Sequence, residues 1–219
     1  MSERCSNEAG DAESALDVSF EFPAKPVAEP PTLERIVDVL PRLGHVLWLT
    51  RTRADGAFPR ARLLAPGVLL LDHAALNALR DCVAVRAFGA VAAHGPREWL
   101  EFRDTAQAPI ARLYLLPDTD LFAWDRMLAG CRVEACAIAP RGCPHACLSI
   151  AQRALRRRRE TWEARIVQMP LLRLTGLRVL GLRASANVAP ISREIAQSIA
   201  CDDGAAFADG EDDRPRRPQ

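Results

Sequence analysis

Two alternating segments near the middle of the chain constrain its fold more than any other feature. Residues 98–104, EWLEFRD, place Leu100 and Phe102 on one face and Glu101 on the other, which is the period of a β-strand. Residues 111–116, ARLYLL, alternate in the same way. Because the residues between them suit a hairpin loop, the two segments are predicted to pair as antiparallel strands.

A helix is expected to follow the second strand without a linker. Pro117 cannot donate a hydrogen bond to a sheet and therefore ends the strand. Thr119 or Asp118 is the expected N-cap, Asp120 is favourable in the first turn, and Gly130 ends the helix. The apolar face of this helix is predicted to consist of Leu121, Trp124 and Leu128.

The remaining segments indicate a mixed fold. Residues 33–40, after the predicted N-cap Thr32, and residues 191–200 have helical periodicity, and residues 73–79 can form one or two helical turns. Apolar runs predict strands at 45–50, 68–71 and 82–92, while 171–184 is strand-like or irregular. The predicted fold class is α+β: a curved, mostly antiparallel sheet with flanking helices and a C-terminal helical extension.

Composition divides the chain into four expected parts. Residues 1–31 are acidic and rich in Pro, which predicts a disordered N-terminal tail, and residues 32–130 form the α+β domain. Residues 131–200 are expected to be a mainly helical extension rich in Cys and Arg, and residues 201–219 a disordered C-terminal tail.

The bulk composition predicts a cytoplasmic protein. The chain is 49% hydrophobic and 26% charged with a formal net charge of +1, which is typical of a globular protein. It has neither a signal-like N-terminus nor an apolar run of about 18 residues, so we expect no membrane insertion. The seven cysteines are an odd number, and reduced thiols are expected in that compartment.

Several framework residues match the pattern of a known family. They are Leu100, Phe102, Asp104, Arg112, Tyr114, Leu115, Asp118, Asp120, Leu121 and Trp124, with Leu43-Gly44 and Leu49-Thr50-Arg51 upstream. Over residues 33–128 the chain resembles one half-repeat of the haemin-utilisation and haemin-degrading family that includes HemS, HmuS and ChuX. It departs from that pattern at Gln107, which stands in place of a turn glycine.

The resemblance implies a function and an assembly. It implies a cytoplasmic haem-binding protein of haem uptake and iron utilisation, acting as a haem carrier or store. Because one half-repeat is present where many members have two, it also implies a homodimer. The chain shows no combination of nucleophile, base and orienting group, so no catalytic residue is predicted.

Four residues are candidates for contact with haem. Haem iron is commonly held by an axial side chain such as histidine, and the propionates favour cations. The resemblance places His73 near a histidine position of the family and Arg80 and Arg112 near family arginines. His45, at the start of the first predicted strand, is the alternative axial ligand.

A second hypothesis is a non-enzymatic metal-binding or regulatory module. Four thiols and an imidazole, which could form a zinc or iron-sulfur site, come from Cys131, Cys136, Cys143, Cys147 and His145. The run RALRRRRETWEAR at residues 153–165 is expected to be a helix and could contact phosphates. Because no series of stacking aromatics accompanies it, nucleic acid is not the expected partner.

Overall fold

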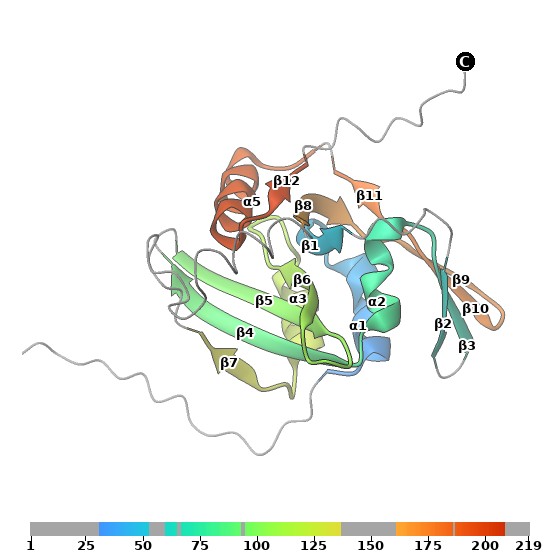
Figure 1. Ribbon diagram of the computed structural model, residues 1–219. Helices are drawn as coiled ribbons and strands as arrows, with labels where there is room; N and C mark the ends of the chain where they lie inside the picture. The colour runs from blue at the N-terminus through green and yellow to red at the C-terminus, as the bar shows by residue number, and fades with distance from the viewer. Residues whose placement is uncertain are drawn as a thin grey trace, which may run out of the picture.

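The larger of two β-sheets forms the centre of the molecule (Figure 1). The computed structural model describes residues 31–52, 60–64, 67–92, 95–136, 161–185 and 187–208. Within these, the larger sheet has the order β11-β8-β1-β6-β5-β4-β7, and β12 pairs with β8. Its strands are β1 (Val46–Thr52), β4 (Ala84–Ala92), β5 (Gly95–Arg103), β6 (Pro109–Tyr114), β7 (Val133–Ala135), β8 (Thr161–Gln168), β11 (Arg183–Ala184) and β12 (Ala206–Phe207).

A smaller sheet lies to one side of the larger one (Figure 1). Its order is β2-β3-β10-β9, formed by β2 (Arg60–Leu64), β3 (Gly67–Leu71), β9 (Leu171–Leu174) and β10 (Leu177–Leu180). Most pairs in both sheets are antiparallel, while β3 with β10, β4 with β7, and β8 with β12 are parallel. The predicted mixed α+β class is therefore confirmed.

Helices cover both faces of the larger sheet. On one face, α1 (Leu33–Val39), η2 (Ala74–Leu76), α2 (Ala78–Asp81) and α3 (Leu121–Leu128) bury residues in a core that contains Trp48 and Phe102. A short 3-10 turn, η1 (Leu40–Arg42), continues α1. On the other face, α5 (Pro190–Asp203) packs over a second core that contains Leu47, Trp99 and Tyr114. Each strand in the middle of the sheet therefore buries side chains in both directions.

The predicted pair of alternating strands is confirmed. β5 and β6 are antiparallel, with Leu100 opposite Leu113 and Glu101 opposite Arg112. Leu100 and Phe102 lie in the first core, as the alternation predicts. Glu101 faces the other way and is nevertheless buried, at 5% exposure, because α5 covers that face.

The N-cap of the helix after Pro117 lies one residue after Thr119 and two after Asp118, the two N-caps that the sequence indicates. Asp120 is the N-cap, and its carboxylate accepts a hydrogen bond from the Ala123 backbone N–H at 3.0 Å. The hydroxyl of Thr119 instead accepts from the Leu116 N–H and donates to the His45 carbonyl. Thr119 therefore ties the end of β6 to the start of β1 and cannot cap the helix.

Two other expectations for this helix and the C-terminal region differ from the structure. Leu121 is 57% exposed, and the buried face of α3 consists of Ala123, Trp124 and Met127. A mainly helical extension is not confirmed, because the described residues after 160 form β8 to β12 as well as α5. The run at 153–165, which was predicted to be helical, ends in β8, and β8 pairs with β1 along the whole length of β1. The C-terminal tail was expected to begin at residue 201, but α5 and β12 continue to residue 207.

Some expectations lie outside the described residues. They concern the N-terminal tail up to residue 30, most of the arginine-rich run and the C-terminal tail from 209. Among the helices that are described, none is long and apolar enough to cross a membrane.

The turn between β5 and β6 contains Gln107 in a strained backbone conformation. In the sequence pattern that the chain resembles, this position is a glycine. Gln107 has φ 58°, in the left-handed region that a side chain disfavours. The turn is held by the Asp104 carboxylate, which accepts from the N–H groups of Ala106 and Ala108.

Replacing Gln107 with glycine is therefore expected to raise the free energy of unfolding by about 0.5 to 1 kcal/mol, because relief of strain exceeds the added chain entropy. Urea denaturation measures this difference. Gln107→Ala is the matched control, since it shortens the side chain but keeps the strain. If alanine stabilised the protein as much as glycine, the backbone conformation at this position would not be the cause.

Candidate functional site

A small pocket opens between the end of β1, the start of β2 and the helical turns η2 and α2. Its volume is about 50 Å³. The residues that line it are Thr50, Arg51, Arg60, Ala74, Asn77, Ala78, Asp81 and Ile110. Arg60 gives the pocket a cationic group, and Asp81, which is paired with the neighbouring Arg80 at 2.7 Å, contributes a carboxylate. Arg51 borders the pocket, but its guanidinium lies 5.4 Å from the centre of the Trp162 ring, on the face of the larger sheet that α5 covers.

The walls of the pocket are fixed from two directions. The indole N–H of Trp48 donates to the Ala75 carbonyl at 3.0 Å, which holds η2 against β1. The guanidinium of Arg62 donates to three carbonyls at the end of α2, those of Leu79, Arg80 and Cys82. Arg62 thus occupies acceptors that a helix end otherwise leaves free.

One polar group in the pocket has unused hydrogen-bonding capacity. The side-chain oxygen of Asn77 is buried and has no hydrogen-bond partner among the described residues. An unpaired buried acceptor costs free energy, so a donor from a ligand or water at this point is favourable. The pocket therefore combines an unpaired buried acceptor, on Asn77, with the cation of Arg60.

His73 lies next to the pocket as the N-cap of η2. Its Nδ1 accepts the backbone N–H of Ala75 at 3.0 Å. A neutral imidazole with Nδ1 as acceptor carries its proton on Nε2. His73 therefore fits an axial ligand through Nε2 only if that proton leaves or moves to Nδ1, and the latter breaks the cap.

His45 lies at the opposite end of β1 from the pocket. Its Nε2 is 2.9 Å from the side-chain nitrogen of Gln168, the last residue of β8. Six residues of extended chain separate His45 from Arg51, which corresponds to roughly 20 Å. His45 and the pocket are therefore separate sites, and a ligand that contacted both would have to span that distance.

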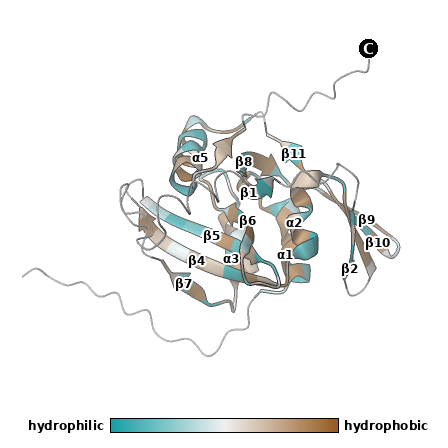
Figure 2. Ribbon diagram, in the orientation of Figure 1, coloured by the Kyte–Doolittle hydropathy of each residue, from teal (hydrophilic) through white to brown (hydrophobic). Residues whose placement is uncertain are grey.

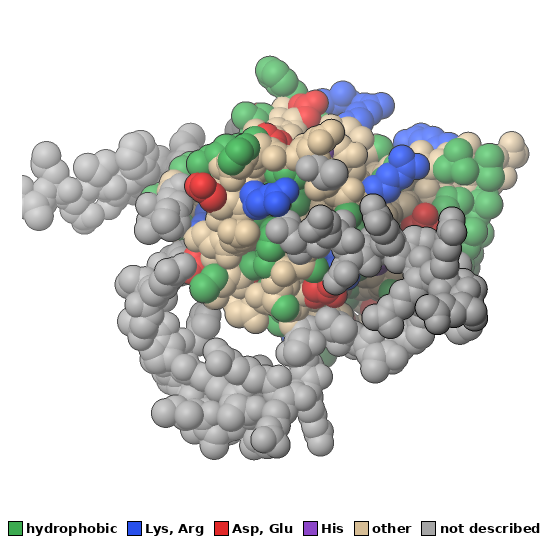
Figure 3. Space-filling view, turned by 90° about the horizontal axis from the view of Figure 1, so that it is seen from above, with side chains coloured by type: hydrophobic (Ala, Val, Ile, Leu, Met, Phe, Trp, Pro, Cys, Tyr) green, Lys and Arg blue, Asp and Glu red, His purple; other side chains and the backbone are tan. Residues whose placement is uncertain are grey.

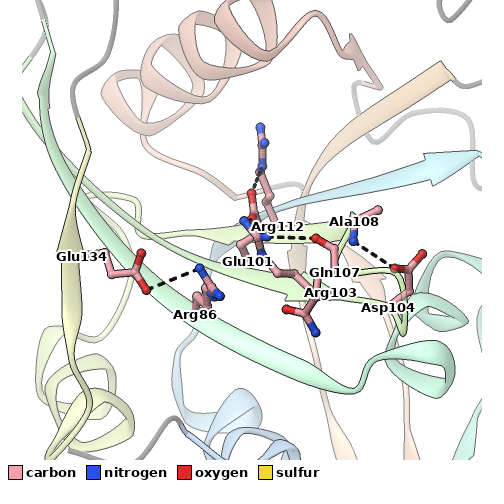
Figure 4. Close-up of polar contacts among 8 residues, drawn as sticks. All are labelled: Arg86, Glu101, Arg103, Asp104, Gln107, Ala108, Arg112 and Glu134. Carbon is pink, nitrogen blue, oxygen red and sulfur yellow. Dashed lines mark hydrogen bonds and ion pairs between the residues drawn. The ribbon is translucent and has the colours of Figure 1, made fainter. Parts of the chain in front are cut away.

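The two candidate arginines lie on opposite faces of the larger sheet. Arg80 is in α2, on the face that carries Trp48. Arg112 is in β6 on the face covered by α5, where it pairs with Glu101 at 3.1 Å and with Asp203 at 2.9 Å. Figure 4 shows Arg112 beside Glu101, together with the neighbouring turn that contains Gln107.

Arg112 is already fully used within the fold. Its guanidinium also lies 5.4 Å from the centre of the Trp162 ring. Burial lowers the pKa of Arg112, but nearby Asp203, Tyr114 and Glu101 outweigh burial, and the net pKa is raised. Arg112 is therefore a permanent cation that holds α5 on the sheet, and His73 and Arg112 are not brought together.

Of the residues proposed for a zinc or iron-sulfur site, only Cys131 and Cys136 lie among the described residues. Cys131 is partly buried, and burial raises the pKa of its thiol, with Arg35 acting in the opposite direction. Cys136 is exposed, while Cys143, His145 and Cys147 lie outside the described residues. Within the described part no group of three or more potential metal ligands occurs, so the four-thiol site stays a prediction.

Sequence reasoning missed three residues of the pocket. Arg51 was noted as part of a Leu-Thr-Arg framework segment, and nothing in its local pattern indicates a pocket. Arg60 begins β2, a strand for which the sequence has no clear alternation. Asn77 joins η2 to α2, and only the packing of these turns against β1 shows that its oxygen is buried.

The fold and the site define an α+β protein with an arginine-lined pocket at one end of the central strand. No family profile matches the chain, and no curated protein does. Among solved structures it is similar to the heme degrading enzyme ChuS of Escherichia coli O157:H7, with 21% identity, a TM-score of 0.32, and coverage of 45% of this chain and 32% of that one. It is also similar to holo-PhuS, a heme-binding protein from Pseudomonas aeruginosa, with 22% identity, a TM-score of 0.34, and coverage of 59% and 42%. The chain thus spans less than half of each, and neither likeness supports an argument about the site.

Proposed function

We propose that this chain is a haem-binding protein of haem uptake and iron utilisation, acting in the cytoplasm as a carrier or store. The observation that carries the proposal is the pocket with Arg60, which lies beside the turn that begins at His73. A haem ligand needs cations for its propionates and a donor for its iron at neighbouring positions. The framework resemblance of residues 33–128 supports the same ligand.

The size of the pocket decides which part of haem it accepts. Small-molecule sites usually enclose about 300 to 1,000 Å³, whereas this pocket encloses about 50 Å³. That volume suits one carboxylate and excludes a porphyrin ring. Arg60 would therefore hold a propionate, since a guanidinium group binds a carboxylate with charge-assisted hydrogen bonds.

His73 is the axial candidate closest to this pocket, and it requires a rearrangement. Its ring must release the cap on Ala75 if Nδ1 is to carry the proton, because a histidine that binds metal through Nε2 donates from its other nitrogen. The arginine pocket fits a propionate as it stands. We therefore propose Arg60 as the main determinant of affinity and His73 as the determinant of the iron spectrum.

Titration of haemin into the purified full chain, followed at the Soret band, tests the proposal. The wild type is expected to give a saturable one-to-one change. Arg60→Gln is expected to weaken binding by about tenfold or more, because at least one charge-assisted hydrogen bond is lost. His73→Ala is expected to shift the Soret maximum with a smaller loss of affinity.

Two control variants separate the function from the site. Arg86→Gln removes a surface arginine of β4 that is 45% exposed, and it should leave the titration unchanged. His45→Ala tests the other end of β1. If the wild type gives only unsaturable broadening, the function is wrong; if His45→Ala alone abolishes the Soret change, haem is bound but not at this pocket.

A further inference from the structure

The smaller sheet has two very different faces. On the inner face, Leu69, Leu71 and Leu180 are fully buried in the first core. The same face carries Arg178, which is 12% exposed and pairs with Asp38 of α1. This face is therefore the one by which the sheet packs against the rest of the molecule.

The outer face is formed by two apolar rows that cross all four strands. Residues paired directly across neighbouring strands lie on the same face of a sheet. The register places Leu63, Val68, Leu177 and Leu174 in one row and Ala61, Leu70, Val179 and Leu172 in the next. All eight of these described side chains are apolar.

These side chains belong to neither core. None of the eight residues is part of the two buried clusters or of the partly buried residues packed against them. Leu63 is 82% exposed, Leu172 59% and Leu174 54%. Figure 2 shows the hydrophobic colouring of β9 and β10, and in Figure 3 hydrophobic side chains gather at the side of the molecule where Figure 1 places this sheet.

We propose that this outer face is the contact surface for a second copy of the chain, packed face to face in a two-fold dimer. Sheets pack in this way with their apolar side chains interdigitated and about 10 Å between them. Because a two-fold contact sets the same patch against itself, each apolar row meets an apolar row and no charge is removed from water. A contiguous exposed apolar face is typical of a protein interface.

The available area is sufficient for a stable contact. Complete burial of an aliphatic side chain removes about 60 Å² or more of apolar surface from water. Four of the eight side chains are already partly buried within the chain, those of Val68, Leu70, Leu177 and Val179. Two copies of the face would therefore bury at most on the order of 1,000 Å², which is about the lower limit for a specific interface. The inference is independent of the proposed haem function, because none of the eight residues lines the pocket.

The mass of the protein in solution tests the inference. Sedimentation equilibrium is expected to give twice the 24.0 kDa chain mass, at concentrations from about 1 to 100 µM. Leu63→Glu with Leu172→Glu places charges on both edge strands of the face, and it is expected to weaken dimerisation about 100-fold or more. Both side chains are exposed, so the monomer should keep its near-UV circular dichroism.

The matched control is Phe122→Glu, which charges an equally exposed hydrophobic residue on α3, 85% exposed and far from the two rows in the fold. It should leave the dimer intact. The inference is overturned if the wild type is a monomer throughout, or if both charged variants behave alike. It is also overturned if removal of residues 1–30 from a monomeric wild type creates self-association, because the chain's own N-terminal segment would then be the occupant.

Discussion

Replacing Asp202 with alanine is expected to lower the free energy of unfolding by about 2 to 3 kcal/mol. Asp202 lies near the end of α5 and binds the guanidinium of Arg97 in β5 at 2.7 Å. Arg97 is only 7% exposed, so removal of its carboxylate leaves a buried charge with the Ser198 hydroxyl as a weaker partner. The loss should fall below the largest values for buried pairs, because Asp202 itself is 24% exposed.

A second substitution distinguishes charge from packing. Adding Arg97→Met to Asp202→Ala removes the stranded cation but keeps much of the side-chain volume, so a large part of the lost stability should return. Asp125→Ala, on the exposed side of α3, is the control for loss of a carboxylate near a helix end. Urea denaturation of the four proteins gives the comparison. Equal instability of the single and double variants would contradict this account.

This prediction concerns α5, for which the sequence predicted a helix but not the part of the fold against which it packs. Its periodicity was sufficient to predict a helix over 191–200, and the structure confirms one. Its small buried residues, Ala196 and Ala200 among them, let it approach the sheet closely. Nothing local in the sequence indicates that Asp202 and Asp203 meet arginines about a hundred positions earlier in the chain.

The first half of the fold could be predicted because its sequence signals are local. The alternation of β5 and β6 and the Pro-Asp-Thr-Asp junction are properties of short windows, and the Thr32 cap of α1 is another. The error in the predicted N-cap of α3 is caused by a tertiary contact. Thr119 has the chemistry of a cap, but its hydroxyl is engaged with the His45 carbonyl from a distant segment.

The second half was harder to predict because its structure depends on partners that are distant in the sequence. Trp162, Ala164 and Ile166 alternate with Glu163 and Arg165 in β8, yet they follow an arginine-rich run with helical composition. Pairing with β1 decides in favour of a strand, and β1 lies more than a hundred positions earlier. Such long-range pairing overrides a weak local preference.

The candidate site divides in the same way. The helical turns predicted at 73–79 are present as η2 and α2, because a few residues determine such turns, and His73 caps the first while Arg80 lies in the second. Arg112 matched a family position, but its surroundings depend on α5, which lies far away in the sequence. A surface arginine and a buried one look alike in a sequence, so the alternation of β6 could not show that Arg112 is paired with two carboxylates.

The same buried cluster predicts an alkaline loss of stability that can be observed at a single residue. Tyr114 is the only tyrosine in the chain, and its hydroxyl donates to Asp203 at 2.7 Å. Burial raises the pKa of Tyr114, and the Asp203 charge raises it further, with Arg112 acting in the opposite direction. In an unfolded chain the phenol has a pKa of about 10.

The sign of the effect follows from these two states. Above pH 10 the unfolded chain releases the phenol proton while the folded protein retains it, so the stabilisation present below pH 10 is lost as the pH rises toward the folded pKa. The loss attributable to Tyr114 is expected to be about 1.4 kcal/mol by pH 11 and nearly twice that by pH 12. Urea denaturation at a series of pH values measures it.

Tyr114→Phe provides the comparison, because it removes the ionisable proton and retains the ring that stacks on Trp99. The variant starts from a lower stability, since Asp203 loses a hydrogen bond, but its stability should fall less steeply above pH 10. The buried thiol of Cys82, whose pKa burial raises, is present in both proteins and cancels in the difference. Tyrosinate absorbance gives an independent result: folded wild type should show none at pH 10, whereas denatured protein should be about half ionised. Appearance of tyrosinate at pH 10 in the folded protein would mean that Tyr114 is not held under α5 by Asp203.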